Sequence, residues 1–264
     1  MNINVLNSSP YFAVVVGNSH LHWGYFKTGK LQITWDTPHL SAPITTNKLP
    51  KHLLLPQLPD NLPVYFTSVV LSQTQLWRTY PKIKIITQTH IPLQKLYPTL
   101  GIDRALAVLG AGKTYGFPCL VVDAGTALTF TGVDSDQTLI GGAILPGLRL
   151  QFKSLANNTA ALSEEVLPTS LPILWGTTTS EAIQSGVVHS VLAVIKTFIK
   201  DWLKKFSDSQ VIITGGDSQQ IINYIKDHND IFLDELKQDN NLIFWGIREV
   251  SFLRTTNNYT KPQI

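Results

Sequence analysis

The stretch from Tyr11 to Lys30, YFAVVVGNSHLHWGYFKTGK, indicates the architecture of the chain, because a unit of the same design returns in the second half. A β-branched run ends at a glycine turn, a second strand follows, and a polar turn leads into a third strand. The stretch from Cys119, CLVVDAGTALTFTGVDSDQTLIGGAIL, repeats this order about 110 residues later. We therefore predict two related lobes, each beginning with a strand, a glycine turn and two further strands.

The two units correspond residue by residue around their glycines. When Gly17 is placed on Gly125, Val15 falls on Asp123. A period of about half the chain favours two related lobes over a solenoid, whose repeats are about 20 to 50 residues long. The predicted organisation is an N-terminal lobe over residues 1–118, a C-terminal lobe over 119–254 and a polar tail over 255–264, which we expect to fray.

The composition is that of a folded, weakly charged protein. The 264 residues are 44% hydrophobic and 15% charged, with a formal net charge of +3. The basic residues are scattered rather than gathered in a stripe, so we expect no nucleic-acid partner. The only cysteine, Cys119, lies in an apolar run, where we expect a buried and inert thiol. No stretch has the pattern of a signal peptide or a membrane span, so we expect a cytoplasmic protein without a membrane partner.

Helical patterns follow these strands. Asp103 to Gly112 is a run of strong helix formers. Thr178 and Glu181 have the spacing of a capping box, and an apolar stripe continues behind them as far as Trp202. A helix of that length is suited to lining a domain or subunit interface. Ser209 to Asp217 is another strand ending at glycines, followed by an amphipathic helix. The fold class is therefore α/β, with mixed sheets flanked by helices.

Three turns that follow strands are candidate phosphate sites. They are Gly17-Asn18-Ser19, Gly125-Thr126 and Gly215-Gly216. Glycine lets a phosphate approach the backbone N–H groups, although most glycine turns are only turns. Their recurrence in a duplicated unit favours the phosphate reading. Asp123 closes the strand before the second turn, where it either holds a cation or bonds its own backbone.

The run Gly101-Ile102-Asp103-Arg104 carries an acid and an arginine at a helix start. The common reading is a favourable interaction with the helix dipole. If the pair faces a cleft, Asp103 is suited to accept a proton from a substrate hydroxyl, and Arg104 to bind a carboxylate or phosphate. The residues alone leave both readings open.

Two other signals are weaker. His20 and His22 alternate on a predicted strand, but no third ligand lies at a recognisable spacing, which favours a structural role over a metal site. Gly110 to Thr114, GAGKT, has the end of a P-loop pattern but closes a helix instead of joining a strand to one. We therefore expect Lys113 to interact with the C-terminal end of that helix.

Five motifs occur in the order and spacing of a known family and cover nearly the whole chain. The chain resembles type III pantothenate kinases, members of the acetate and sugar kinase, Hsp70 and actin superfamily. The family has two lobes, and each of them begins with a phosphate-binding hairpin. The motifs are GIDR (101–104), VVDAGTALTF (121–130), GGAILPGLRLQFKSLANNTAAL (141–162), TSEAIQSG (179–186) and ITGGD (213–217).

The resemblance implies ATP-dependent phosphorylation of pantothenate, the first step of coenzyme A synthesis. It implies a homodimer that uses Mg²⁺ or another divalent cation together with K⁺ or NH₄⁺. By the same resemblance, Asp103 matches the general base, and Asp123 matches the ligand of the monovalent cation. The remaining matches are Gly101, Ile102, Asp103, Arg104, Thr179 and Tyr97 for pantothenate, and Val15, Val16, Gly17, Asn18, Ser19, His20, Leu21, His22, Gly125, Thr126, Gly215 and Gly216 for ATP.

The first phosphate motif departs from the family. The family pattern is Asp-x-Gly-Asn-Thr, whereas this chain has Val15-Val16-Gly17-Asn18-Ser19, so the carboxylate that helps to place the metal is missing. Phosphoryl transfer depends on positioning and charge neutralisation, which makes that loss costly unless another group replaces it. Two hypotheses follow: a working kinase, or a catalytically weak nucleotide-binding accessory or regulatory protein. The presence of Asp103, Asp123 and Thr179 together favours the kinase.

Overall fold

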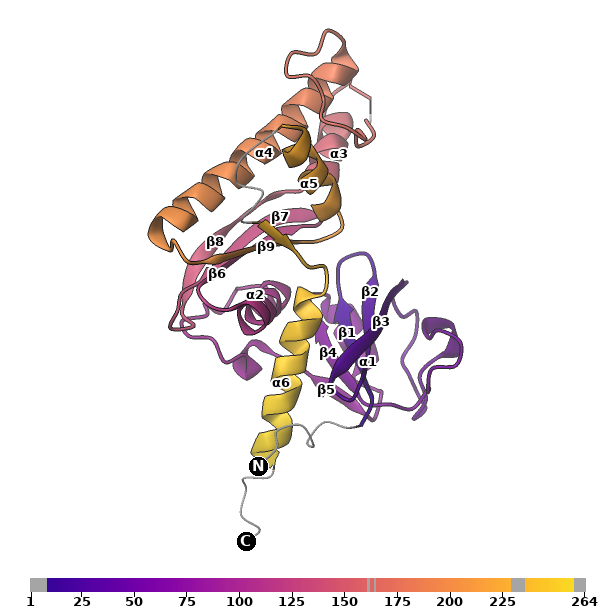
Figure 1. The fold of residues 1–264 in the computed structure, drawn as a ribbon. Helices are drawn as coiled ribbons and strands as arrows, with labels where there is room; N and C mark the ends of the chain where they lie inside the picture. The colour runs from indigo at the N-terminus through magenta and orange to yellow at the C-terminus, as the bar shows by residue number, and fades with distance from the viewer. Residues whose placement is uncertain (1–8, 161, 164, 229–235, 259–264) are drawn as a thin grey trace. The chain divides into compact units, whose positions relative to one another are not determined.

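The computed structural model describes residues 9–160, 162–163, 165–228 and 236–258. The chain forms two compact units, residues 1–113 with 243–264, and residues 114–242. The α/β class with two mixed sheets, predicted from the sequence, is confirmed (Figure 1). The units differ from the predicted lobes chiefly at the C-terminal end, because residues 243–254 belong with the first unit.

The two sheets have the same topology. In order across the sheet, the first is β3-β2-β1-β4-β5 and the second is β8-β7-β6-β9-β10. Three antiparallel strands are followed in each by two parallel ones. The strands are β1 (Tyr11–Val16), β2 (Leu21–Lys27), β3 (Lys30–Thr37), β4 (Val64–Ser68), β5 (Ile83–Ile85), β6 (Cys119–Ala124), β7 (Ala127–Val133), β8 (Leu139–Pro146), β9 (Gln210–Thr214) and β10 (Leu236–Gln238).

Six α-helices lie within the described residues. Those predicted around Asp103–Gly112 and after Thr178 are present, and α6 continues to Asn258, into the segment predicted to fray. A helix already nucleated extends at little cost even through polar residues. The helices are α1 (Leu71–Trp77), α2 (Ile102–Tyr115), α3 (Leu148–Asn158), α4 (Thr179–Lys205), α5 (Ser218–Asp227) and α6 (Leu242–Asn258), with short 3-10 helices at Lys51–Leu53 and Gln88–His90.

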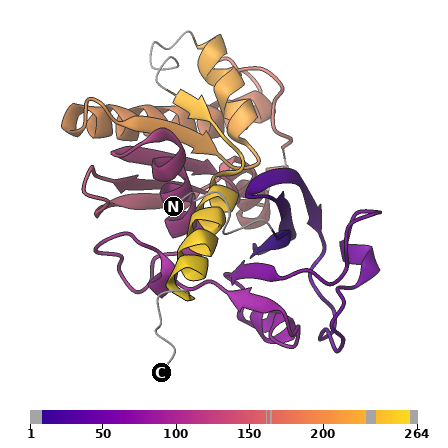
Figure 2. The same cartoon turned by 60° about the horizontal axis from the view of Figure 1, so that its bottom comes forward.

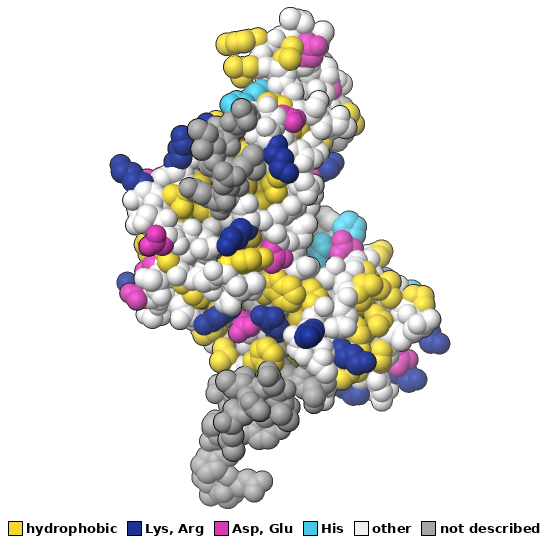
Figure 3. Space-filling model, in the orientation of Figure 1, with side chains coloured by type: hydrophobic (Ala, Val, Ile, Leu, Met, Phe, Trp, Pro, Cys, Tyr) yellow, Lys and Arg dark blue, Asp and Glu magenta, His cyan; other side chains and the backbone are white. Residues whose placement is uncertain are grey.

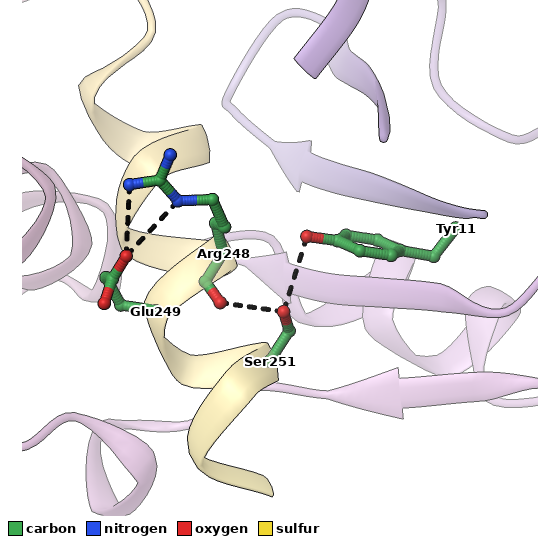
Figure 4. Close-up of polar contacts among 4 residues, drawn as sticks. All are labelled: Tyr11, Arg248, Glu249 and Ser251. Atoms are coloured by element: carbon green, nitrogen blue, oxygen red, sulfur yellow. Dashed lines mark hydrogen bonds and ion pairs between the residues drawn. The ribbon is translucent and has the colours of Figure 1, made fainter. Parts of the chain in front are cut away.

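Alternate residues of β1 serve the two faces of the first sheet. Phe12, Val14 and Val16 pack with Trp77 of α1 and other residues in one apolar core. On the opposite face, Tyr11 meets α6: the Ser251 hydroxyl lies 3.4 Å from the Tyr11 hydroxyl (Figure 4). Burial of this contact raises the pKa of Tyr11 above its usual range.

The same face explains why α6 belongs with the first unit. Gly24 of β2 leaves room for the Phe244 ring, which a Cβ there would approach to 2.9 Å. Phe26 and Trp245 meet edge to face with ring centroids 6.4 Å apart. Figure 2 shows α6, in yellow, beside the indigo strands. The sequence pattern did not predict these contacts, because they join the C-terminal end of the chain to strands near its N-terminus.

The capping box predicted at the start of α4 is formed. The backbone N–H of Glu181 donates to Thr178 Oγ1 at 3.2 Å, and the N–H of Thr178 donates to Glu181 Oε2 at 3.1 Å. Hydrogen bonds, first among them the one from the Thr177 backbone N–H, lower the pKa of Glu181. These contacts fix the residue at which the helix begins.

The apolar stripe of α4 covers one face of the second sheet. Val187, Val191, Ile195 and Ile199 are buried in one core with β6, β7 and β9. Among the described helices, α4 alone is long and apolar enough to cross a membrane, a property that core helices share. Its packing in this core accounts for its composition.

Two minor expectations are confirmed. Cys119 is a free, buried thiol, and burial raises its pKa to about 12. The GAGKT run lies within α2 and not at a strand-to-helix turn, and Lys113 is in the last turn of that helix.

Candidate functional site

The first hairpin turn is closed by its own backbone. The N–H of Gly17 donates to the carbonyl of His20 at 3.0 Å, so this donor is used within the turn. Asn18, Ser19 and His20 are exposed. The Gly17 carbonyl also lies 2.9 Å from Nε2 of His39, which ties the turn to the segment after β3. A phosphate at this turn would therefore meet Asn18 and Ser19 rather than the Gly17 N–H.

The apolar side chains of the first motif are buried, so they are not available to a ligand in the turn. The side chains of Val15, Val16 and Leu21 are 5%, 0% and 0% exposed. His22 is 45% exposed and lies beside the glycine turn, with its Nε2 3.3 Å from the position of a Cβ on Gly17. Of the polar side chains on β2, His22 is thus the one placed against the turn.

The second hairpin has a similar turn. The N–H of Gly125 donates to the carbonyl of Ala127 at 3.2 Å, and the N–H of Gly147 donates to the carbonyl of Thr126 at 3.0 Å. Thr126 itself is exposed. The residue after β8 is therefore a fixed part of this hairpin, and the Thr126 hydroxyl remains accessible to a ligand.

The turn after β9 packs directly on the second hairpin. The Asp217 N–H donates to the Ala124 carbonyl at 2.9 Å. Gly215 has φ of +94°, and a Cβ there would lie 2.5 Å from Asp123 Oδ1. Only glycine fits this backbone and this approach. Gly216 faces open space. The structure thus brings together Asp123, Gly125, Thr126, Gly215 and Gly216, all predicted from the sequence.

The GIDR motif forms the start of α2 in the first unit. Asp103 Oδ1 accepts from the Arg104 N–H at 2.9 Å, as an acid in a first turn does. The Arg104 side chain is 7% exposed, and its Nη1 donates to the Tyr97 hydroxyl at 3.2 Å. Asp103, Arg104 and Tyr97 therefore lie together. Asp103 itself is half-buried.

Thr179 lies at the exposed start of α4 in the second unit. It lines an open, mainly apolar cavity of about 440 Å³ with Leu155, Ile183 and Val187. The volume is in the range of small-molecule sites. Nothing in the sequence pattern indicated this cavity, because its walls come from α3, α4 and the segment between them.

Two contacts beside the hairpins were missed by sequence reasoning. Arg149 Nε donates to the buried carboxylate of Asp217 at 2.9 Å, which holds a cation next to the second hairpin. In the first unit, His22 Nδ1 lies 2.7 Å from Asp36 Oδ1. Both pairs join residues distant in sequence. Strand register relates His22 to Asp36, whereas Arg149 and Asp217 lie at the starts of two helices, α3 and α5, which the sequence pattern does not relate.

The possible metal ligands around the turns suit a cation that is bound together with a nucleotide. Within the described part of the chain, no three His, Cys, Asp or Glu side chains gather into a metal-binding group. Mg²⁺ commonly keeps several waters and binds substrate phosphates with one or two carboxylates, so it needs no cage of protein ligands. The residues present therefore fit a nucleotide-bound metal rather than a metal cage.

Comparison with known structures supports the fold. A Campylobacter jejuni protein described as a conserved putative Baf family transcriptional activator has a TM-score of 0.60 at 19% identity, over 94% of this chain and 99% of that one. MreB5 of Spiroplasma citri bound to AMPPNP has a TM-score of 0.51 at 10% identity, over 96% and 99%. At these identities the two likenesses show a shared fold.

Comparison of sequences is more specific. A type III pantothenate kinase of Nostoc sp. is 42% identical over 92% of this chain and 94% of its own length. One from Synechocystis sp. is 44% identical over 91% and 90%. The profile of the type III pantothenate kinase family matches residues 11–201, which include both hairpins, the GIDR motif and most of α4. The chain therefore belongs to the type III pantothenate kinase family.

Proposed function

We propose that this protein transfers the γ-phosphoryl group of ATP to the hydroxyl of pantothenate, which yields 4′-phosphopantothenate for coenzyme A synthesis. The observation that carries the proposal is identity above 40% with named pantothenate kinases over about nine tenths of the chain. The motif residues that the resemblance requires are also present, with the exception of the carboxylate at position 15.

The pantothenate residues are assigned to two places. In the first unit, Asp103 is the general base that accepts the proton of the attacking hydroxyl, and Arg104 contacts the substrate beside it. Their hydrogen bonds support these roles, because the Tyr97 hydroxyl orients the guanidinium. In the second unit, Thr179 contacts pantothenate at the edge of the apolar cavity. Gly101 and Ile102 provide the backbone from which Asp103 projects.

The nucleotide is assigned to the three glycine turns. Asn18 and Ser19 of the first hairpin and Thr126 of the second carry exposed polar groups for the phosphates. Gly216 leaves open space for the rest of the nucleotide. Asp123 would hold K⁺ or NH₄⁺, and Mg²⁺ would be bound mainly by ATP and water. Metal ions at these positions neutralise charge on the transferred group.

We assign the protein to the cytoplasm as a homodimer. An apolar surface supports the homodimer: Ile173, Leu174 and Trp175, just before α4, are 58%, 58% and 85% exposed. Figure 3 shows hydrophobic side chains at the surface around this end of α4. Large apolar side chains gathered on a surface mark an interaction site. Neither nucleic acid nor a membrane is among the proposed partners.

A coupled assay of ADP release tests the proposal. The wild-type chain should release ADP only when pantothenate, ATP and Mg²⁺ are all present, and mass spectrometry should find phosphopantothenate. The accessory hypothesis predicts ATP binding without pantothenate-dependent ADP release. That result, obtained across a full range of Mg²⁺ concentrations, would refute the kinase assignment.

A further inference from the structure

The first unit carries a row of four side chains at the carboxyl end of its sheet. Strand register pairs Asp36 with His22, His22 with Val15, and Val15 with Thr67, on β3, β2, β1 and β4. Directly paired residues project from the same face of a sheet. The position of the missing carboxylate, Val15, is therefore in line with a histidine and an aspartate, beside the glycine turn.

The equivalent row in the second unit contains a carboxylate on its central strand. There the same register pairs Thr129 with Asp123 and Asp123 with Thr214. Asp123 and Val15 stand at equivalent places, two residues before a glycine on the first strand of each sheet. Thr214 and Thr67 are likewise equivalent on the fourth strand. In the second unit the carboxylate lies on the central strand, whereas in the first unit it lies two strands away, at Asp36.

Two observations indicate that a polar group belongs at this place. Thr67 is 1% exposed, and its hydroxyl has no hydrogen-bond partner in the structure. A buried hydroxyl without a partner is costly, and this one lies next to the Val15 position. His22 is held by Asp36 through Nδ1 at 2.7 Å, which leaves Nε2 directed at the Gly17 turn. Figure 3 shows histidine and acidic side chains together at the surface over the β1–β2 hairpin.

We propose that the His22–Asp36 pair performs the work of the missing carboxylate by binding the hydrated divalent cation carried by ATP. With its Nδ1 proton directed to Asp36, His22 presents Nε2 as an acceptor for a water on that cation. Asp36 supplies the negative charge that an aspartate at position 15 would bring. The assignment rests on the proposed use of ATP, and it makes His22 and Asp36 positioning residues rather than catalytic ones.

The pair is tested by binding, without turnover. The affinity of the full-length chain for AMPPNP is measured by calorimetry with EDTA and then with saturating Mg²⁺. The ratio of the two affinities reports the metal-dependent part of binding. His22→Ala should lower this ratio about 10- to 100-fold, as loss of an outer-shell partner of a metal does. Asp36→Asn should also lower it. His52→Ala, an exposed histidine of the same unit, is the matched control and should leave the ratio at the wild-type value.

A rescue variant makes the test specific. In the double variant Val15→Asp with His22→Ala, the carboxylate returns to the central strand, where the Thr67 hydroxyl can donate to it. The ratio should rise again to within a few-fold of wild type. Circular dichroism and melting temperature establish that each variant is folded. If the double variant does not fold, His22→Ala and Asp36→Asn decide the question by themselves.

Three results would overturn the proposal. One is a wild-type ratio in His22→Ala. Another is an equal loss with EDTA and with Mg²⁺, which would assign His22 to the nucleotide itself. The third is a folded double variant that stays as weak as His22→Ala. Pantothenate-dependent ADP release is measured separately on the wild-type chain, so failure of the kinase assignment is distinguishable from failure of this one.

Discussion

At the scale of single residues, the general-base assignment of Asp103 gives a direct test. Asp103→Asn keeps an acceptor for the Arg104 N–H, so the start of α2 should survive. The amide cannot accept the substrate proton, and kcat should fall about 100- to 10,000-fold. Steady-state kinetics with pantothenate, together with AMPPNP affinity as a measure of intact binding, checks this. A kcat within a few-fold of wild type would show that another group is the base.

Asp123 is the proposed ligand of the monovalent cation. Because a monovalent cation needs oxygen ligands, Asp123→Ala should abolish the stimulation of ADP release by K⁺ or NH₄⁺. Asp136→Ala, in the exposed turn between β7 and β8, is the control and should keep the stimulation. Initial rates are compared across a series of KCl concentrations at constant ionic strength. Equal K⁺ dependence in Asp123→Ala and wild type would contradict the assignment.

How far single residues are predictable depends on whether their partners are local. Asp103 and Asp123 are recognisable because each lies within a continuous motif. The partnership of His22 with Asp36 is not, because it depends on a register shift. The turn at Thr28–Gly29 alone would pair His22 with Trp35, and the irregularity next to Tyr25 and Phe26 moves the pairing on by one residue. A bulge of one residue changes which side chains of two neighbouring strands lie on the same face of the sheet, and no sequence pattern here predicts the bulge.

At the scale of elements, the start of α4 is the best-defined local structure. Thr178→Ala removes the side-chain acceptor for the Glu181 N–H. Loss of such an N-cap should reduce the free energy of unfolding by about 1 kcal/mol. Thr197→Ala, the same substitution inside the same helix, should be neutral or slightly stabilising because alanine favours helices. Urea unfolding of the two variants side by side measures both effects. Equal stability of the two would show that the cap contributes little.

Elements were predictable where a pattern is long or bounded by turn chemistry. The ends of β1 follow from its β-branched run and Gly17, and those of α4 from its capping box and apolar stripe. In contrast, β5 and β10 have three residues each, too few for alternation to be recognised. Their places are set by pairing with β4 and β9. The strands that form the hairpins were therefore predicted, and the short edge strands β5 and β10 were not.

At the scale of the whole molecule, internal repetition is the most informative feature of the sequence. It predicted two sheets of one design, and both have the same strand order. It did not predict that α6, at the end of the chain, belongs to the first unit, because the second copy has no counterpart of that return. The helix is placed by contacts such as Phe244 against Gly24, which join residues separated by most of the chain. The burial of apolar side chains of α6 against the first sheet therefore places this helix in the first unit, although it follows the second unit in the sequence.

The proposed homodimer depends on an apolar surface of the second unit. If the apolar surface before α4 joins two copies, Trp175 is its most exposed large side chain, at 85%. Tryptophans buried on association commonly contribute about 2 kcal/mol or more, so Trp175→Ser should weaken the dimer at least about 30-fold. Leu71→Ser, at a residue 76% exposed in the first unit, should leave association unchanged. Light scattering after size exclusion, over a range of concentrations, gives the mass of each. A monomeric wild type, or a Trp175→Ser variant that stays dimeric on dilution alongside Leu71→Ser, would show that this surface does not hold two copies together.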